Sequence, residues 1–410
     1  MIQKIATKNL APGMKVVNLD LPWLSNPFLY AIEGVLDTQE EIDRIIAEGF
    51  LEVYVDLDSV EHQDDVDQEV RDSMPSGERS IVHHDKVPPK VSLEQELPIA
   101  RALFDDSVRF AHNALLDMRN GEDLPLEAGE KIVDEILDSI TRNYNALLGL
   151  IKLRSRDEYT YTHCINVCVL ASLLAVQIGL DPDSIKKVGV AGLFHDIGKA
   201  HIPDEILNKN DRLTDEEFEV MKKHPELGMQ HVKRIELPEE IISGIRDHHE
   251  KINGKGYPRG LKGDEISQTA RIIAIVDVYD ALTSRRVYKD PMLPHQALSL
   301  MYSMRGEEFD EEMLAHFIRS QGIYPVGSVV ELSSGWRGVV VQINPEKPLY
   351  PKVALVRSPL GRNLYGEILD LGAQSQVKIT KVMTPGEAGV DPAVAIPGTT
   401  TGASQQYVTA

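Results

Sequence analysis

The spacing of apolar residues changes twice along the chain and divides it into three regions. Near the N-terminus, residues 14–19 and 51–57 alternate apolar and polar side chains as strands do, and residues 38–46 have the spacing of a capped helix. From about residue 99 to 321, apolar positions recur every three or four residues, which predicts helices. Short alternating runs return over residues 325–383 and predict strands. The pattern therefore predicts a mainly α fold, with a helical core, a small N-terminal α/β module and a small C-terminal β element.

Composition places the boundaries between these regions. Residues 59–98 are acidic, polar and interrupted by prolines, as linkers are. Residues 384–410 are rich in Pro, Gly, Thr, Ser and Gln, which is typical of a disordered tail. The helical region is expected to begin with two long amphipathic helices, near residues 99–118 and 126–152. The expected organisation is an α/β module over 1–58, a linker over 59–98, a helical domain over 99–324, a β element over 325–383 and a tail over 384–410.

The formal net charge of −21 limits the partners that the protein can bind. Nucleic-acid polymers and anionic membranes attract proteins through a basic field, so neither is an expected partner. A polyanionic small molecule would need local cations, either side chains or metal ions, to overcome this background.

Cysteine content and hydropathy point to a reducing, aqueous compartment. Cys164 and Cys168, the only cysteines, lie one helical turn apart in an apolar segment, so we expect reduced thiols and no disulfide. Residues 1–11 lack the continuous apolar core of a signal peptide, and the most apolar run, residues 164–178, is too short to span a bilayer. We therefore expect a cytoplasmic protein.

Imidazoles and carboxylates interrupt segments whose other residues predict burial. Asp277 is the clearest case, because it lies within an apolar run where an unpaired carboxylate is costly to bury. His195 and Asp196 end a predicted helix, with Gly198 as its stop and Lys199 in the loop beyond. The full set of such groups is His163, His195, Asp196, His224, His248, His249 and Asp277.

Each of these groups alone is more simply a satisfied core histidine or half of a buried ion pair. Together they fit a preformed site for two divalent ions, in which Asp196 could bridge through its two oxygens. Two ions about 3.5–4 Å apart can share a hydroxide and stabilise the attacking and leaving oxygens at phosphorus. Neighbouring positions on a helix point about 100° apart, so His248 and His249 can both converge on this site only if their helix has already ended.

Four motifs in the central region together resemble a known family. They are His195-Asp-Ile-Gly-Lys199, His248-His249-Glu250, Asn253-Gly-Lys-Gly-Tyr-Pro258 and Asp277-Val-Tyr-Asp-Ala-Leu-Thr-Ser-Arg-Arg-Val-Tyr-Lys289. With these motifs, residues 155–290 closely resemble the HD-GYP domain, a branch of the HD phosphohydrolases that hydrolyses cyclic di-GMP in bacteria. Residues 10–24 more loosely resemble a domain of unknown function often found ahead of HD-GYP domains.

The resemblance implies roles for the residues that match the family. The implied metal ligands are the seven groups above, and a Glu that binds a third ion in some members is replaced here by Tyr159, so we expect two ions. Lys199, Arg286 and Lys289 match residues that contact substrate phosphates. Lys199 would also assist departure of the leaving oxygen.

Two further residues are candidates for contact with substrate. Gly254 and Gly256 predict a tight turn that presents Tyr257 at the rim of the cavity, where its ring could pack on a nucleotide. Asp280 lies one helical turn after Asp277 and is a candidate either for substrate contact or for holding a metal ligand.

The leading hypothesis is a metal-dependent phosphodiesterase that hydrolyses cyclic di-GMP to linear pGpG through a metal-bridging hydroxide, with further cleavage to GMP left open. Fe or Mn is the preferred metal, with Ni, Co and Zn as alternatives. One competing hypothesis is a phosphodiesterase for another cyclic dinucleotide. Another, from a different class, is a catalytically slow sensor or interaction module that responds to cyclic di-GMP. The N-terminal module would regulate activity, mediate a homodimer or bind a signalling partner.

Overall fold

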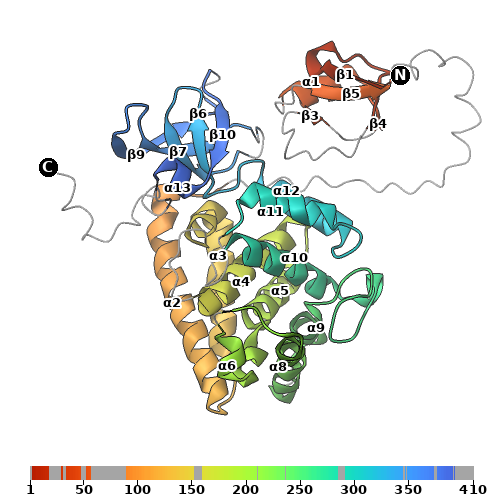
Figure 1. Cartoon of the computed structure of the whole chain (residues 1–410), viewed down its shortest axis with the longest axis vertical. Coiled ribbons are helices and arrows are strands. Elements are labelled where there is room, and N and C mark those ends of the chain that lie inside the picture. The colour runs from red at the N-terminus through yellow and green to blue at the C-terminus, as the bar shows by residue number, and fades with distance from the viewer. Residues whose placement is uncertain are drawn as a thin grey trace, which may run out of the picture.

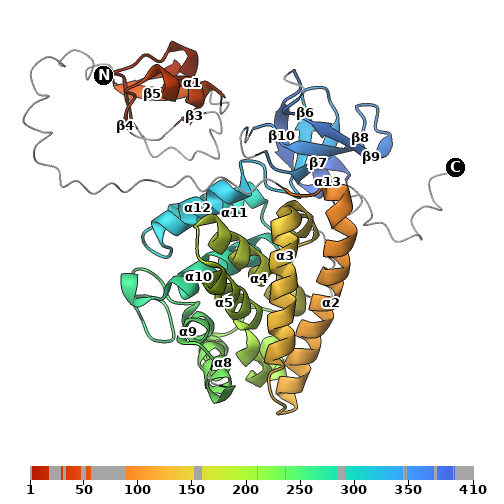
Figure 2. The same ribbon diagram turned by 180° about the vertical axis from the view of Figure 1, so that it is seen from behind.

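The computed structural model describes residues 2–17, 29–30, 34–47, 52–56, 89–151, 159–209, 211–235, 237–284, 291–344, 347, 349–373, 376–390 and 392. The described residues form mainly helices, with a small sheet toward each terminus. Figures 1 and 2 show this arrangement from two sides. The predicted mainly α fold is therefore confirmed.

The N-terminal module is a small sheet with one helix. Strand β5 (Glu52–Asp56) is its centre, pairing antiparallel with β1 (Ile2–Ala6) and β2 (Lys15–Val16) and parallel with β3 (Leu29–Tyr30). Helix α1 (Gln39–Ala47) lies where the sequence predicted it. The sheet also contains β4 (Gly34–Val35), and the buried core consists of Leu10, Val16, Leu36, Ile42, Ile45, Val53 and Val55.

The helical domain is built around one helix that is buried on all sides. In α4 (Tyr159–Gln177), every residue over 165–175 is buried, which explains why this segment is apolar on every face. It packs against helices α2 (Leu93–Arg119), α3 (Leu126–Ile151), α5 (Pro182–Phe194) and α10 (Gln268–Thr283). The other helices of the domain are α6 (Asp204–Leu207), α7 (Asp215–Met221), α8 (His224–Val232), α9 (Glu239–Asp247), α11 (Pro294–Ser303) and α12 (Glu311–Gln321).

Helix α2 begins earlier than the sequence predicted. It starts at Leu93, so residues 93–98, assigned to the linker, are helical. A reciprocal cap explains the start: the Ser92 hydroxyl accepts a hydrogen bond from the Gln95 backbone N–H, and the Gln95 side chain accepts one from the Ser92 N–H. Pro98, the last residue of the predicted linker, lies inside this helix.

The C-terminal β element is a five-stranded antiparallel sheet in the order β10-β6-β7-β8-β9. Alternate residues of β7 (Arg337–Gln342) face opposite sides: Val339 and Val341 join the core of the helical domain, whereas Val340 joins a separate cluster within the sheet. The sheet thereby caps the end of the helical bundle at which α2 begins (Figure 2). Its other strands are β6 (Val329–Leu332), β8 (Lys352–Arg357), β9 (Asn363–Asp370) and β10 (Ile379–Met383).

The predicted disordered tail is wrong over its first residues. Helix α13 (Pro385–Ala388) follows a capping box at Thr384, and Val390 is buried beyond it. The Pro and Gly that suggested disorder instead bound this short helix, with Pro385 at its first position and Gly389 in the left-handed region after it. Residues 393–410 lie outside the described residues.

Two further sequence expectations concern α4 and the membrane. Cys164 and Cys168 are both free and lie on α4, as predicted. In the part of the chain that the structure describes, no helix is both long enough and apolar enough to cross a bilayer.

Gly198 does not end α5 as the sequence suggested. The helix ends at Phe194, and Gly198 lies in a 3-10 turn, η4 (Ile197–His201), that packs against α8. A Cβ at this position would lie 1.9 Å from the carbonyl oxygen of His224 and 2.5 Å from the backbone nitrogen of Gly228. Glycine is therefore required because two backbone segments approach closely, and not because the chain turns to a positive φ.

We predict that Gly198→Ala lowers the unfolding temperature of the protein by about 5 °C or more, because the added methyl group forces η4 and α8 apart. Circular dichroism during heating measures the effect. Gly386→Ala is the control, since Gly386 lies in α13 with open space around its Cβ position and should leave the unfolding temperature unchanged or slightly raised. Equal unfolding temperatures for Gly198→Ala and the native protein would contradict the steric account.

Candidate metal centre

The predicted imidazoles and carboxylates converge, and most of them are held at helix ends. His163 lies in the first turns of α4, His195 caps α5 and Asp196 follows it, while His224 is the first residue of α8. His248 caps α9, His249 follows it, and Asp277 projects from the middle of α10. The described residues contain three overlapping groups whose potential ligand atoms all lie within 4.8 Å of one another. These groups are His163, His195 and Asp277; His195, Asp196 and His248; and His224, His248 and His249.

Three of the histidines are oriented by the same local hydrogen bond. Nδ1 of His195, His224 and His248 each lies 2.8 Å from the carbonyl oxygen three residues earlier in the chain. A carbonyl can only accept, so Nδ1 carries the hydrogen, and in the neutral form of each ring Nε2 keeps its lone pair. Because the last carbonyls of a helix lack intrahelical partners, a histidine at or just beyond a helix end can make this bond and point Nε2 away from the helix.

Asp196 lies between two sets of ligands. Its Oδ2 is 3.3 Å from Nε2 of His195 and 3.7 Å from Nε2 of His163. Its other oxygen, Oδ1, is 3.2 Å from Nε2 of His224. The two oxygens thus face different histidines, which is the arrangement that a bridging carboxylate requires.

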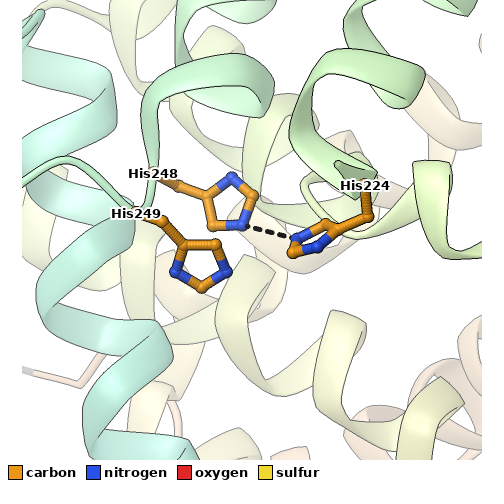
Figure 3. Close-up of side chains that lie close together, drawn as sticks. All are labelled: His224, His248 and His249. Carbon is orange, nitrogen blue, oxygen red and sulfur yellow. Dashed lines mark hydrogen bonds between the residues drawn. The ribbon is translucent and has the colours of Figure 1, made fainter. Parts of the chain in front are cut away.

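The second set of ligands is the histidine cluster in Figure 3. Nε2 of His224 and Nε2 of His248 lie 3.4 Å apart, and the rings of His248 and His249 are 4.1 Å apart between centroids. His249 converges with His248 because α9 has ended at Asp247, so the 100° rotation of a continuing helix does not apply. Asp277 links the two sets, with Oδ1 3.0 Å from His163 Nε2 and Oδ2 3.8 Å from His249 Nδ1.

The donor set fits divalent cations. Nε2 of His195 and Oδ1 of Asp196 are buried without a hydrogen-bond partner in the described structure, although buried polar atoms are ordinarily satisfied. Nε2 of His224 and of His248 face each other with lone pairs when their Nδ1 atoms donate, which is repulsive unless a cation lies between or beside them. Histidine nitrogens with carboxylate oxygens are ligands suited to Fe, Mn, Co, Ni or Zn.

Both carboxylates stay ionised although they are buried. Burial alone would raise the pKa of Asp196, but its interactions with His195 and with the Lys199 ammonium outweigh burial and hold that pKa well below its usual range. Burial opposes the ionisation of Asp277 in the same way, and its hydrogen bond and charge interaction with His163 hold its pKa well below the usual range. The centre therefore contains two buried anions, each beside a positively charged side chain: Lys199 for Asp196 and His163 for Asp277.

The imidazoles differ in their protonation. Burial lowers the pKa of His248 well below its ordinary value and that of His249 to about 3, so both are neutral, the form that binds metal. Burial would also lower the pKa of His163, but hydrogen bonds with Asp277 and Asp280 outweigh it and raise that pKa to about 9. A divalent ion at Nε2 of His163 would take the place of this proton.

Asp280 supports a ligand and does not reach a substrate surface. It is completely buried, and Oδ2 lies 2.8 Å from Nδ1 of His163. Asn166 and Ser284 donate hydrogen bonds to its Oδ1 at 2.9 and 3.1 Å. We therefore assign Asp280 to positioning His163, and the substrate contact considered from the sequence is not supported. Sequence reasoning missed Asn166, whose signal was a polar residue one turn after His163 in an apolar helix.

Lys199 and Tyr257 lie at the edge of the centre. Nζ of Lys199 is 2.5 Å from Oδ2 of Asp196. Burial would lower the pKa of Lys199, but the charge and hydrogen bond of Asp196 outweigh burial and raise it, so the ammonium is retained. The ring of Tyr257 lies over that of His249, with centroids 4.8 Å apart and planes 33° apart.

The loop that presents Tyr257 is fixed by the buried carboxylate of Glu250, a motif residue for which the sequence predicted no role. Glu250 accepts hydrogen bonds from the backbone N–H groups of Arg259 and Leu261, at 2.6 and 3.0 Å. Gly256 packs so tightly on this segment that a Cβ would lie 2.4 Å from Glu250 Cα. Gly256 is therefore needed for close contact with the protein's own backbone.

The predicted phosphate contacts Arg286 and Lys289 lie outside the described residues.

Comparisons with known proteins match three successive regions of the chain to known domains. Residues 2–128 match a domain of unknown function (DUF3391), residues 146–313 an HD domain, and residues 329–389 a KOW domain associated with HD domains. The chain is 34% identical over 390 residues to a cyclic di-GMP phosphodiesterase of Pseudomonas aeruginosa, covering 95% of this chain and 93% of that protein.

Two other likenesses are more partial. A 3'3'-cGAMP-specific phosphodiesterase of Vibrio cholerae is 31% identical over 192 residues, covering 47% of this chain and 44% of that protein. The solved structure of an HDGYP protein from Bdellovibrio bacteriovorus aligns with a TM-score of 0.43 and 17% identity, covering 77% of this chain and 98% of that one. The near full-length match to the Pseudomonas protein, together with the HD-domain match, shows that the chain belongs to the HD-GYP family of HD-domain phosphohydrolases.

Proposed function

We propose that the protein is a metal-dependent phosphodiesterase that hydrolyses cyclic di-GMP to linear pGpG. The observation that carries this proposal is Asp196, whose two oxygens face ligand sets on opposite sides. The near full-length relative, which is a cyclic di-GMP phosphodiesterase, supports the choice of substrate.

The site is proposed to hold two divalent ions, with Fe or Mn preferred and Ni, Co or Zn as alternatives. His163, His195 and Asp277 would hold one ion and the histidines of Figure 3 the other, with Asp196 shared. Bound ions would acidify water and neutralise charge on the phosphodiester. The side chain of Tyr159, where some relatives have a third-ion glutamate, lies outside the described residues.

The chain's own residues would bind and orient the substrate. Lys199 keeps its ammonium beside Asp196, where it can bind a phosphate oxygen or give its proton to the departing ribose oxygen. Tyr257 would line the rim over His249. Arg286 and Lys289 are also proposed to bind substrate phosphate, because both belong to the Asp277–Lys289 motif that resembles the family.

A second candidate function is hydrolysis of another cyclic dinucleotide. The partial relative that is specific for 3'3'-cGAMP favours it, because a similar HD domain accepts that substrate. A slow sensor that responds to cyclic di-GMP is less favoured, because none of the predicted ligand positions is displaced from the cluster. The free thiols support a cytoplasmic setting, and the N-terminal module is proposed to regulate activity or bind a partner.

We predict turnover of cyclic di-GMP by the full chain with Mn²⁺ or, without oxygen, with Fe²⁺, and at least about a hundredfold loss in Asp196→Ala. Chromatographic separation of cyclic di-GMP, pGpG and GMP measures both. Asp211→Ala, at an exposed carboxylate, is the matched control and should retain full activity. No turnover by the native protein with any tested metal would contradict the enzymatic proposal.

We predict that Asp280→Ala lowers metal affinity or activity by about 10–100-fold, because it removes the acceptor that orients His163. Asp280→Asn should lose less, since an amide oxygen can still accept a hydrogen bond from Nδ1. Metal titration of both variants provides the comparison. Equal losses in the two variants would show that the hydrogen bond to His163 is not what matters.

A substrate panel separates the two candidate functions. We predict a higher kcat/KM for cyclic di-GMP than for 3'3'-cGAMP or cyclic di-AMP, measured at equal metal loading. A higher value for 3'3'-cGAMP would favour the second candidate.

A further inference from the structure

Phe218 is unusual among the described apolar residues because it is an aromatic side chain of which nearly half is exposed to water. It is 46% exposed and is the one aromatic residue among the large apolar side chains that are exposed in the described part of the chain. It lies on α7, a short helix with no buried residue. Aromatic rings bring much apolar surface and are normally covered, so an exposed one beside an active site suggests a ligand.

The rings of Phe218, Tyr257 and His249 form a series that leads from the surface to the metal centre. His249 lies 4.8 Å from Tyr257 between ring centroids, and Tyr257 lies 6.4 Å from Phe218 with the planes 81° apart. Tyr257 thus has one neighbour in the ligand cluster and the other on the exposed surface. Phe218 is therefore at the outer edge of the same site.

A cation accompanies this aromatic edge. Lys222 follows Phe218 by one helical turn, and its Nζ lies 5.5 Å from the centroid of Phe218 and 5.9 Å from that of Tyr257. Nζ also pairs with Glu219. The side chain of Glu219 is 67% exposed and that of Lys222 is 27% exposed, so water reaches the pair from the glutamate side and Lys222 can exchange Glu219 for another acceptor.

A purine base is the ligand that uses both features. Its flat face can stack on the exposed ring of Phe218, and a lysine ammonium can donate to the O6 and N7 acceptors of guanine. Adenine presents an amino group in place of O6 and would repel the ammonium at that position. A phosphate alone would use Lys222 but would leave Phe218 in water.

We propose that Phe218 and Lys222 form a base-binding subsite that favours guanine over adenine. The subsite rests on the proposed phosphodiesterase function, since it would hold one base of the cyclic dinucleotide while its phosphate lies at the metal centre. Phe218 supplies stacking for any purine, and Lys222 supplies the discrimination.

Two variants and two kinds of measurement test the subsite in the Mn²⁺-loaded full chain. Phe218→Ala should raise KM for cyclic di-GMP and Kd for GMP about tenfold. Lys222→Met should reduce the preference for GMP over AMP, measured as the ratio of Kd values by calorimetry, about fivefold. Hydrolysis of methyl p-nitrophenyl phosphate, which has no nucleobase, should stay within about twofold of the native rate in both variants, because neither Phe218 nor Lys222 belongs to the groups of candidate metal ligands.

The matched controls are Leu300→Ala, another exposed apolar residue, and Lys223→Met, an exposed neighbour of Lys222. Both should leave KM and Kd unchanged. GMP has no phosphodiester bond, so its binding is measured independently of the proposed reaction. If the native protein binds GMP as described but does not cleave cyclic di-GMP, the proposed function fails and the subsite stands. If turnover occurs and Phe218→Ala leaves both KM and Kd unchanged, or lowers hydrolysis of the base-free ester equally, the subsite is wrong.

Discussion

The hydrogen bond from a histidine Nδ1 to a fixed acceptor is the interaction on which the metal centre depends. In His195, His224 and His248 the acceptor is the carbonyl three residues earlier, and in His163 it is Asp280. In each histidine, the Nδ1 hydrogen bond satisfies a buried acceptor and fixes the tautomer that carries its hydrogen on Nδ1. The same bond orients the ring so that Nε2 points toward the centre. The candidate ligands are thereby placed by local backbone geometry, mostly at helix ends, and the packing of the helices has only to bring those ends together.

Close backbone packing brings the helix ends together. The turn that follows His195 and Asp196 contacts the start of α8 through Gly198, at a distance that admits no side chain. The same approach places His224 Nε2 next to Asp196 Oδ1. The buried, ionised carboxylates of Asp196 and Asp277 then attract positive charge to this site. This explains how a chain with a net charge of −21 can present a site for a phosphodiester: the cations are concentrated where the substrate must bind.

Much of this arrangement could be predicted from residue patterns, and the failures have physical causes. Apolar periodicity is strong in buried helices such as α4, so the mainly α fold was predictable, and Asp277 stood out because it interrupts such a run. Strand β1 was missed because five residues at a terminus carry little periodicity, and its pairing with β5 is a non-local contact. The start of α2 was misplaced because residues 93–98 were assigned to the acidic, polar linker, whereas the cap at Ser92 begins the helix at Leu93. The roles of Gly198 and Asp280 depend on contacts between distant segments, which no local pattern contains.

Metal stoichiometry tests the central claim most directly. Full-length protein purified without chelators, loaded with Mn²⁺ or anaerobically with Fe²⁺ and freed of excess metal, can be measured by plasma mass spectrometry beside Asp196→Ala. The arrangement of two ligand sets that share Asp196 predicts about two ions per chain in the native protein and one or fewer in the variant. A single ion in the native protein, or two ions retained by Asp196→Ala, would contradict the account.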